Sequence, residues 1–357
     1  MINKLQKFFK NKDILITGHT GFKGAWLSKI LTNWRANVYG YSLEPPTNPN
    51  IYNLINLKNK INFFKGDVRN FNYLKKIFEE VNPEIVIHLA AQPLVKEGYI
   101  NPQYTYETNI MGTVNICECI RNNKNVKSFL NITTDKVYEN NEWIWGYREN
   151  EKLNGYDPYS NSKSCSDLIT QSYYKSFFKK LGISTSIARA GNVIGGGDFA
   201  KDRIIPDCVK GALNHENIII RNPYSIRPYQ HVLEPLSAYL TIIKGQYNNI
   251  SLSDCYNIGP NSSDCITTSE LVNLFCKEWG NGLKWINESS DNLHEANYLK
   301  LDSSKVNNIF NWKPKWNIEE AVKKTIEWTK IYCEDGSVKN LNKCMDKQII
   351  NYFKNKK

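Results

Sequence analysis

Short apolar runs alternate with segments of helical periodicity along the first half of the 357-residue chain. The apolar runs are rich in β-branched residues and comprise DILITG, ANVYGYSL, INFFKGD, PEIVIHLAA, VKSFLNITT and STSIARAG. Strands that alternate with helices predict a parallel sheet covered by helices on both faces. Because such crossovers are right-handed, the sequence predicts a doubly wound, Rossmann-like α/β fold.

A glycine-rich turn stands between the first apolar run and the first helical segment. In TGHTGFKG, Gly18, Gly21 and Gly24 have the spacing G-x-x-G-x-x-G. Such a turn lets the backbone approach a pyrophosphate, which binds the free N–H groups at the start of the helix. The position of the turn favours a dinucleotide site over a purely structural turn. Glu44 comes late for a ribose contact, and no arginine follows to bind a 2′-phosphate, so we expect NAD rather than NADP.

The alternating pattern becomes looser after about residue 190. Helical patterns remain at VLEPLSAYLTIIKGQ, SELVNLFCKEWG and EEAVKKTIEWTKIY, and IIIRN and CYNIG resemble strands. No spacer-like segment separates the two halves of the chain. We therefore expect a dinucleotide-binding Rossmann domain over 1–190 and a smaller mixed α/β, substrate-binding lobe over 191–357, interleaved with the first domain.

Composition argues against several other classes of protein. The net charge is +11, but the lysines are dispersed and no arginine-rich stripe occurs, so we expect an anionic small substrate rather than a nucleic acid. No stretch approaches the ~18 to 20 apolar residues of a membrane span, and the N-terminus lacks the apolar core of a signal peptide. The nine cysteines include no C-x-x-C pair, which predicts reduced thiols in a cytoplasmic protein without a metal site.

Two pairs of residues are candidates for catalysis. Tyr159 and Lys163, in YSNSK, are spaced i and i+4 and share a helix face after the fifth strand. Lowering a tyrosine pKa of ~10 by about three units needs roughly 4 kcal/mol, which cationic neighbours in a shielded site can supply. Tyr159 is thus a candidate base near neutral pH. Asp135 and Lys136 follow the run SFLNI, and they form either a solvated surface ion pair or half of an active site.

The chain resembles the extended short-chain dehydrogenase/reductase superfamily through TGHTGFKG, HLAAQ, NIMGT, TTDK and YSNSK. Within the nucleotide-sugar branch it is similar to the CDP-glucose 4,6-dehydratase family, most specifically in GNVIGGGDFAKDR and SIRPYQHVLEPL. The resemblance implies an NAD-dependent lyase that converts CDP-glucose to CDP-4-keto-6-deoxyglucose and water. Its steps would be oxidation at C4, elimination across C5–C6 and hydride return to C6, in deoxysugar biosynthesis for a surface polysaccharide such as lipopolysaccharide.

The implied chemistry changes the interpretation of Asp135 and Lys136. Tyr159, Lys163 and Thr134, which would orient O4, suffice for oxidation, whereas elimination also needs one proton taken at C5 and one given at O6. The resemblance implies that Asp135 protonates O6, for which burial must raise its pKa. Lys136 would either take the C5 proton as a neutral amine or stabilise the enolate as a cation. Successive side chains of a strand point oppositely, so both reach one sugar only if the chain bends at the strand end.

The resemblance implies further contacts, and arginine suits the diphosphate of the substrate. Cofactor contacts are expected from Gly18, Thr20, Gly21, Phe22, Gly24, Asp67, Val68, Leu89, Ala90, Ala91, Thr108, Tyr159 and Lys163. Substrate contacts are expected from Asn192, Arg203, Arg221, Arg227, His231, Glu295 and Tyr298. A solvated arginine is the alternative for each of the three arginines.

The resemblance also implies a homodimer or a dimer of dimers. The helices of NIMGTVNICECI and of the Tyr159 segment would form its four-helix interface, although their apolar faces could equally be covered within one chain. The alternative functions are a 4,6-dehydratase or epimerase that acts on another nucleotide sugar, and a non-catalytic redox sensor. The presence of TTDK together with Tyr159 and Lys163 argues against the sensor.

Overall fold

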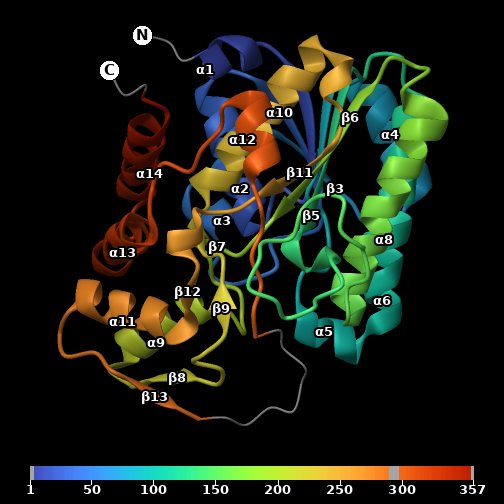
Figure 1. Ribbon diagram of the computed structural model, residues 1–357. Coiled ribbons are helices and arrows are strands. Elements are labelled where there is room, and N and C mark those ends of the chain that lie inside the picture. Colours follow the sequence, from blue (N-terminus) through green and yellow to red (C-terminus); the bar gives the residue numbers. More distant parts are fainter. Residues whose placement is uncertain (1–3, 289–296, 355–357) are drawn as a thin grey trace.

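A seven-stranded parallel sheet forms the centre of the protein in the computed structural model, which describes residues 4–288 and 297–354 (Figure 1). The strand order is β11-β6-β5-β4-β1-β2-β3. The strands are β1 (Asp13–Thr17), β2 (Asn37–Ser42), β3 (Asn62–Lys65), β4 (Ile85–His88), β5 (Ser128–Thr134), β6 (Ser184–Ala190) and β11 (Cys255–Ile258). Apart from the edge strand β11, the order is that of a Rossmann fold, which confirms the predicted fold class.

Helices cover both faces of the sheet (Figure 1). One face packs against α2 (Phe22–Asn33), α10 (Leu233–Asn248) and α12 (Ser304–Phe310), and α14 (Val338–Phe353) extends this core from the outer side of α2. The other face packs against α4 (Phe71–Val81) and α7 (Gly112–Arg121), beside which lie α6 (Pro102–Tyr106) and α8 (Pro158–Tyr173). In β1, Ile14 and Ile16 belong to the first core and Leu15 to the second, because successive side chains point to opposite faces. This two-sided burial explains why the strands are continuous apolar runs.

A third core lies in the smaller lobe. It joins α9 (Ile204–Asn214), β8 (Ile218–Ile220), α11 (Thr268–Trp279) and α13 (Ile318–Glu334), with β13 (Trp285–Asn287) paired to β8. Helix α11 begins with a capping box, in which Thr267 and Glu270 each accept a bond from the other's backbone N–H. The remaining elements are α1 (Lys4–Phe9), α3 (Ile51–Leu54), α5 (Val95–Ile100), β7 (Val193–Ile194), β9 (Ile226–Arg227), β10 (Gln230–His231) and β12 (Ile266–Thr267).

The second half of the chain contributes to both parts of the molecule. Strand β11 pairs with β6 at the edge of the large sheet, and α10 packs on β5 and β6. The two halves are therefore interleaved in space, and a domain boundary at residue 190 stays a prediction. No helix in the part of the chain that the structure describes combines the length and the apolar character needed to cross a lipid bilayer.

Three histidines are buried in these cores. His88 at the end of β4 contacts the Thr17 hydroxyl at 2.7 Å, and Nδ1 of His231 accepts the backbone N–H of Leu233 at 3.2 Å. Neither ring nitrogen of His19 has a hydrogen-bond partner among the described residues. Because burial disfavours the charged imidazolium, it lowers the pKa of each histidine to about 3. All three are therefore neutral in the folded protein at neutral pH.

We expect the protein to lose stability as the pH falls below about 6.5. The unfolded chain protonates its histidines near this pH while the folded protein does not, so the unfolded state binds more protons between about pH 6.5 and 3. Glu234 acts oppositely, since burial raises its pKa to about 7 and the folded state keeps that proton. For these four groups the net difference is about two protons, so together they should lower the free energy of unfolding by roughly 2.7 kcal/mol between pH 6 and 5.

Urea unfolding at the two pH values measures this change. The exposed His215 provides the control, because its replacement by Asn, which also tolerates the left-handed backbone at this position, should leave the slope unchanged. An unfolding free energy equal at pH 6 and 5 would contradict the prediction.

Candidate active site

A cavity of about 610 Å³ opens beyond the carboxyl ends of β5 and β6, where ligands bind in open α/β sheets. Both halves of the chain line it. Among the residues singled out in the sequence, it brings together Thr134, Asp135, Lys136, Tyr159, Asn192, Arg203, Arg221 and Arg227. In the described part of the chain, no group of three or more His, Cys, Asp or Glu side chains is placed to hold a metal ion.

The chain bends sharply where β5 ends. Asp135–Val137 form a 3-10 turn, and the Thr134 side chain accepts the Lys136 N–H at 3.4 Å. The Asp135 side chain is buried, and its Oδ1 accepts the Thr134 hydroxyl at 2.9 Å. Its Oδ2 is also buried, without a hydrogen-bond partner among the described residues. Burial raises the pKa of Asp135, which the positive charge of Lys136 opposes. Because of the bend, Asp135 and Lys136 both line the cavity.

Tyr159 and Lys163 lie in the first turns of α8. Asp157 caps this helix by accepting the Ser160 N–H at 3.0 Å, and Pro158 occupies its first position. The Lys163 ammonium donates to the Ile132 carbonyl of β5 at 2.8 Å. Burial lowers the pKa of Lys163 to about 7, and the charge of Lys23 acts in the same direction.

The pKa of Tyr159 differs from the value expected from the sequence. In the protein alone, burial raises the pKa of this phenol to about 12 instead of lowering it. The reason is that burial penalises the phenolate more than the neighbouring charges stabilise it. The residues alone therefore do not make Tyr159 a base near neutral pH, and a further positive charge beside the phenol is required.

The glycine-rich turn packs directly against the chain that follows β4. Gly18 has φ +75°, and a Cβ at this position would lie 2.6 Å from the Ala90 nitrogen. A Cβ on Gly24 would lie 2.2 Å from the Gly18 oxygen, so both positions require glycine. Phe22 opens α2 directly after the turn. The turn thus presents bare backbone at a helix N-terminus, which fits a pyrophosphate.

Other expected cofactor residues surround this turn. The Thr20 hydroxyl lies 2.6 Å from that of Ser42, at the end of β2. The Thr108 hydroxyl is buried without a hydrogen-bond partner among the described residues. Leu89, Ala90 and Ala91 follow β4, and Asp67 and Val68 follow β3. The Thr108 hydroxyl and the bare backbone of the glycine-rich turn, both near the ends of these strands, fit a dinucleotide.

Two acidic residues near this site have partners of their own. Asp67 forms an ion pair with Arg69 at 2.7 Å, and its backbone oxygen accepts the Tyr41 hydroxyl at 2.8 Å. Glu44 forms an exposed ion pair with Lys65 at 2.9 Å. Glu44 thus lies beyond the end of β2, where its carboxylate is paired with Lys65.

The three arginines expected to contact the substrate differ in their surroundings. Arg203 forms an ion pair with Asp198 at 3.0 Å, and Arg221 forms one with Asp202 at 3.3 Å. Arg227 is 2% exposed, and its Nη1 donates to the Ile226 carbonyl at 3.0 Å. Arg227 is thus a buried residue of the cavity wall and not a solvated arginine.

The structure does not bring every expected residue to the cavity wall. His231 is fully buried and packs against the rings of Trp26 and Trp316, so its expected contact with the nucleotide has no support from the geometry. Tyr298 pairs with Ile226 and precedes Leu299, which lines the cavity. Glu295 lies outside the described residues.

Lys23 is a further residue of the cavity, which was not predicted from the sequence. This residue stands between Gly21 and Gly24, at the start of α2, and it lines the cavity. Burial, with the charge of Arg203, lowers its pKa to about 8. The signal in the sequence is a single lysine inside the glycine-rich turn, a position from which its ammonium can reach a bound anion.

The family model for GDP-mannose 4,6 dehydratase matches residues 15–325. The chain belongs to this family. A curated relative, the CDP-glucose 4,6-dehydratase of Salmonella typhimurium (strain LT2), is 44% identical over 99% of both chains. These matches confirm the resemblance to nucleotide-sugar 4,6-dehydratases.

Solved structures agree on the fold of the family. A UDP-glucose 4-epimerase from Thermotoga maritima, solved with UDP-glucose, has a TM-score of 0.79 at 22% identity and covers 90% of this chain and 99% of its own. A dTDP-glucose 4,6-dehydratase from Bacillus anthracis, solved in complex with NAD, has a TM-score of 0.73 at 23% identity. The match covers 90% of this chain and 96% of that dehydratase. Dehydratases and epimerases thus share the architecture of this chain.

Proposed function

We propose that this protein converts CDP-glucose to CDP-4-keto-6-deoxyglucose and water, with NAD as its cofactor. The observation that carries the proposal is the placement of Asp135, Lys136 and Tyr159 around one cavity next to the glycine-rich turn. The 44% identity to a CDP-glucose 4,6-dehydratase along almost the whole chain supports the choice of substrate. Bound NAD would supply the redox chemistry by accepting hydride from C4 and returning it to C6.

The side chains divide the proton transfers between them. Tyr159 takes the proton of the O4 hydroxyl, which Thr134 orients, and the bound cofactor would add, beside Lys163, the further positive charge that Tyr159 requires. Asp135 gives a proton to O6, and its burial favours the protonated form that this step needs. Lys136 acts at C5, either by taking the proton or by stabilising the enolate.

Arg227 is expected to hold the diphosphate of the substrate. Its removal leaves a phosphate charge without its partner, so Arg227→Ala should weaken CDP-glucose binding by about 2 kcal/mol, or roughly 30-fold. Arg148 provides the control, because its exposed side chain lies 3.9 Å from Asp302, and Arg148→Ala should bind normally. Calorimetry measures both affinities. Unchanged affinity in Arg227→Ala would remove this residue from the substrate site.

A panel of nucleotide sugars tests the proposed function. CDP-glucose, dTDP-glucose and GDP-mannose are incubated separately with the protein and NAD, and the 4-keto product is followed by its absorbance in alkali. Turnover of CDP-glucose in strong preference to the others is expected. Preference for another sugar would favour the alternative, a 4,6-dehydratase of different specificity, and a 4-epimer without loss of water would favour an epimerase.

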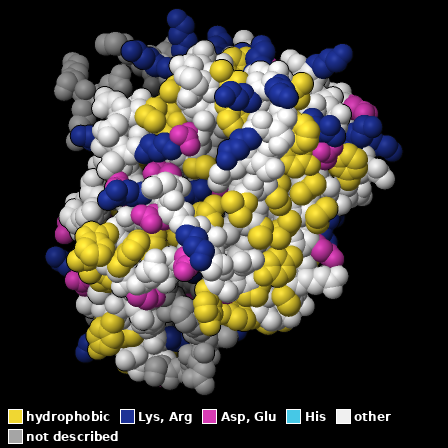
Figure 2. Space-filling model, turned by 45° about the vertical axis from the view of Figure 1, so that its right-hand side comes forward, with side chains coloured by type: hydrophobic (Ala, Val, Ile, Leu, Met, Phe, Trp, Pro, Cys, Tyr) yellow, Lys and Arg dark blue, Asp and Glu magenta, His cyan; other side chains and the backbone are white. Residues whose placement is uncertain are grey.

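We also propose that the enzyme works in the cytoplasm, in deoxysugar biosynthesis for surface polysaccharide, as a homodimer or a dimer of dimers. Figure 2 shows hydrophobic side chains gathered on the face formed by the right-hand helices of Figure 1. Exposed apolar residues of this region include Met111, which is 49% exposed, and Leu168 of α8, which is 50% exposed. A second copy of the chain would cover them.

A further inference from the structure

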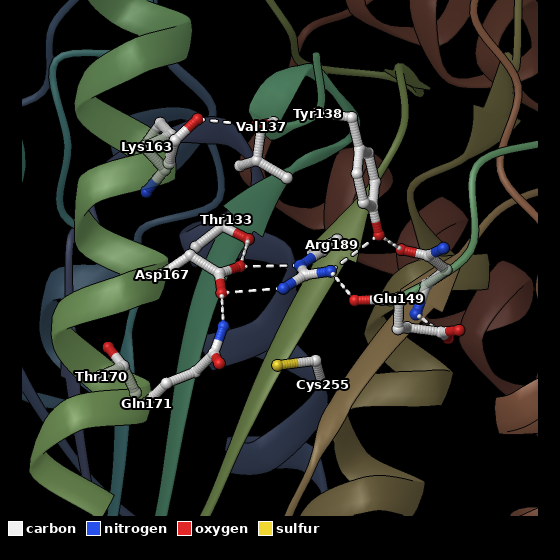
Figure 3. Close-up of polar contacts among 12 residues, drawn as sticks. Thr133, Val137, Tyr138, Glu149, Lys163, Asp167, Thr170, Gln171, Arg189 and Cys255 are labelled. Atoms are coloured by element: carbon white, nitrogen blue, oxygen red, sulfur yellow. Dashed lines mark hydrogen bonds and ion pairs between the residues drawn. The ribbon is translucent and has the colours of Figure 1, made fainter. Parts of the chain in front are cut away.

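A buried ion pair lies behind the cavity, between β6 and α8 (Figure 3). The Arg189 guanidinium binds both carboxylate oxygens of Asp167, with Nε and Nη2 at 2.8 and 2.9 Å. Both side chains are at most 1% exposed. Asp167 is one helical turn beyond Lys163 and two turns beyond Tyr159, so it belongs to the same side of α8.

The other side of Arg189 holds the segment that follows Asp135 and Lys136. Its Nη1 donates to the Tyr138 hydroxyl at 2.8 Å and to the Glu149 carbonyl at 2.9 Å. The Tyr138 hydroxyl in turn donates to Asn257 Oδ1 of β11 at 2.6 Å. Figure 3 shows the guanidinium between the two groups, with Asp167 on one side and Tyr138 on the other.

A second bond joins the same two segments. The Ser164 hydroxyl donates to the Val137 carbonyl at 2.7 Å. Ser164 follows Lys163 directly, and Val137 follows Lys136 directly. The helix that carries Tyr159 and Lys163 is therefore tied at two points to the segment that carries Asp135 and Lys136.

A buried ion pair is a weak source of stability, because the cost of removing two charges from water offsets much of their attraction. Stability alone therefore does not account for this arrangement. We propose that Arg189, together with Asp167 and Tyr138, is a positioning group that fixes Asp135–Lys136 relative to Tyr159–Lys163. The inference rests on the proposed function, in which oxidation uses mainly the pair on α8 whereas elimination needs both pairs. A misplacement of about 1 Å can slow a reaction by ~10²-fold, so loosening the network should slow elimination more than oxidation.

Tyr138→Phe tests the inference with the smallest change. It removes one hydroxyl and keeps the ring, which stacks on Tyr147 at 5.2 Å. Formation of the 6-deoxy product should slow about 10-fold, while the first appearance of reduced cofactor in a single turnover should change less than about twofold. Hydrogen exchange of residues 135–138, measured without substrate or added cofactor, should become faster.

Tyr256→Phe is the matched control. Tyr256 is a fully buried tyrosine of β11 whose hydroxyl, the only group that the substitution removes, donates to the Leu252 carbonyl at 2.6 Å and not to the network. Both half-reaction rates and the exchange of residues 135–138 should match those of the unaltered protein. If Tyr138→Phe lowered both rates equally, or lowered only the melting temperature, the network would be structural and the inference wrong.

Asp167→Asn separates positioning from substrate contact, because Tyr138 is a lining residue of the cavity and Asp167 is not. The same selective loss of elimination is expected, and its absence in a folded Asp167→Asn protein would overturn the inference. If Asp167→Asn does not fold, the inference is tested by the two half-reaction rates of Tyr138→Phe and by the hydrogen exchange of its residues 135–138. If the unaltered protein does not turn over CDP-glucose, the proposed function fails, whereas the exchange of residues 135–138 still tests the positioning.

Discussion

Asp135→Asn is expected to stop formation of the 6-deoxy product while leaving oxidation at C4 in place. Asparagine keeps the size of the side chain and its bond to Thr134 but has no acidic proton for O6. Loss of a general acid costs about 10²- to 10⁴-fold, so product formation should fall at least 10²-fold. Tyr159, Lys163 and Thr134 remain, and reduced cofactor should therefore accumulate, which near-ultraviolet absorbance measures.

Asp346→Asn provides the control for this change. Asp346 forms an ion pair with Lys29 at 2.7 Å on α14, far from the cavity, and its variant should turn over normally. Normal product formation by Asp135→Asn would show that Asp135 has no catalytic role in elimination. The Asp135–Lys136 pair would then be a local ion pair only. Slow product without reduced cofactor would place Asp135 in oxidation and not in elimination.

Tyr159→Phe is expected to abolish both half-reactions together. Without the phenol no group takes the O4 proton, so kcat should fall by about 10²-fold or more and no reduced cofactor should appear. The fold should persist, since one hydroxyl at the cavity is lost. Because the pKa of Tyr159 is about 12 in the protein alone, titration of this phenol should shift to lower pH when NAD is added.

Tyr173→Phe is the matched control on the same helix. The Tyr173 hydroxyl donates to Glu118 at 2.8 Å, at the far end of α8, and its removal should leave turnover unchanged. Near-normal turnover of CDP-glucose by Tyr159→Phe would contradict its assignment as the base. A Tyr159 pKa that stays near 12 after NAD binding would contradict the account of how it is activated.

The sheet and the cavity residues could be predicted from the sequence because each depends on a pattern within one short segment of the chain. Ile14, Leu15 and Ile16 form one apolar run since both faces of the strand are covered. Gly18 and Gly24 sit where a Cβ would collide with backbone. The bend after β5 was required if Asp135 and Lys136 were to reach one sugar, and the 3-10 turn begins at Asp135 itself.

Other properties of the site depend on contacts between segments that are far apart in the sequence, and no sequence pattern shows these contacts. The pKa of Tyr159 follows from the balance between burial and charges brought by separate segments, and this balance could not be judged from spacing. His231 stands in a polar motif, yet tertiary packing buries it against two tryptophans. Arg189 and Asp167 meet only because α8 packs on β5, the strand next to β6, although each looks isolated in its own segment.

The pairing of β11 with β6 also determines when this protein can complete its fold during synthesis. Until residues 255–258 leave the ribosome, β6 is an edge strand with a row of free N–H and C=O groups. Since α10 packs on β5 and β6, the same delay leaves apolar surface uncovered on one face of the sheet. A nascent chain that ends near residue 190 is therefore exposed to aggregation, and its protection must come from chaperones or from rapid elongation.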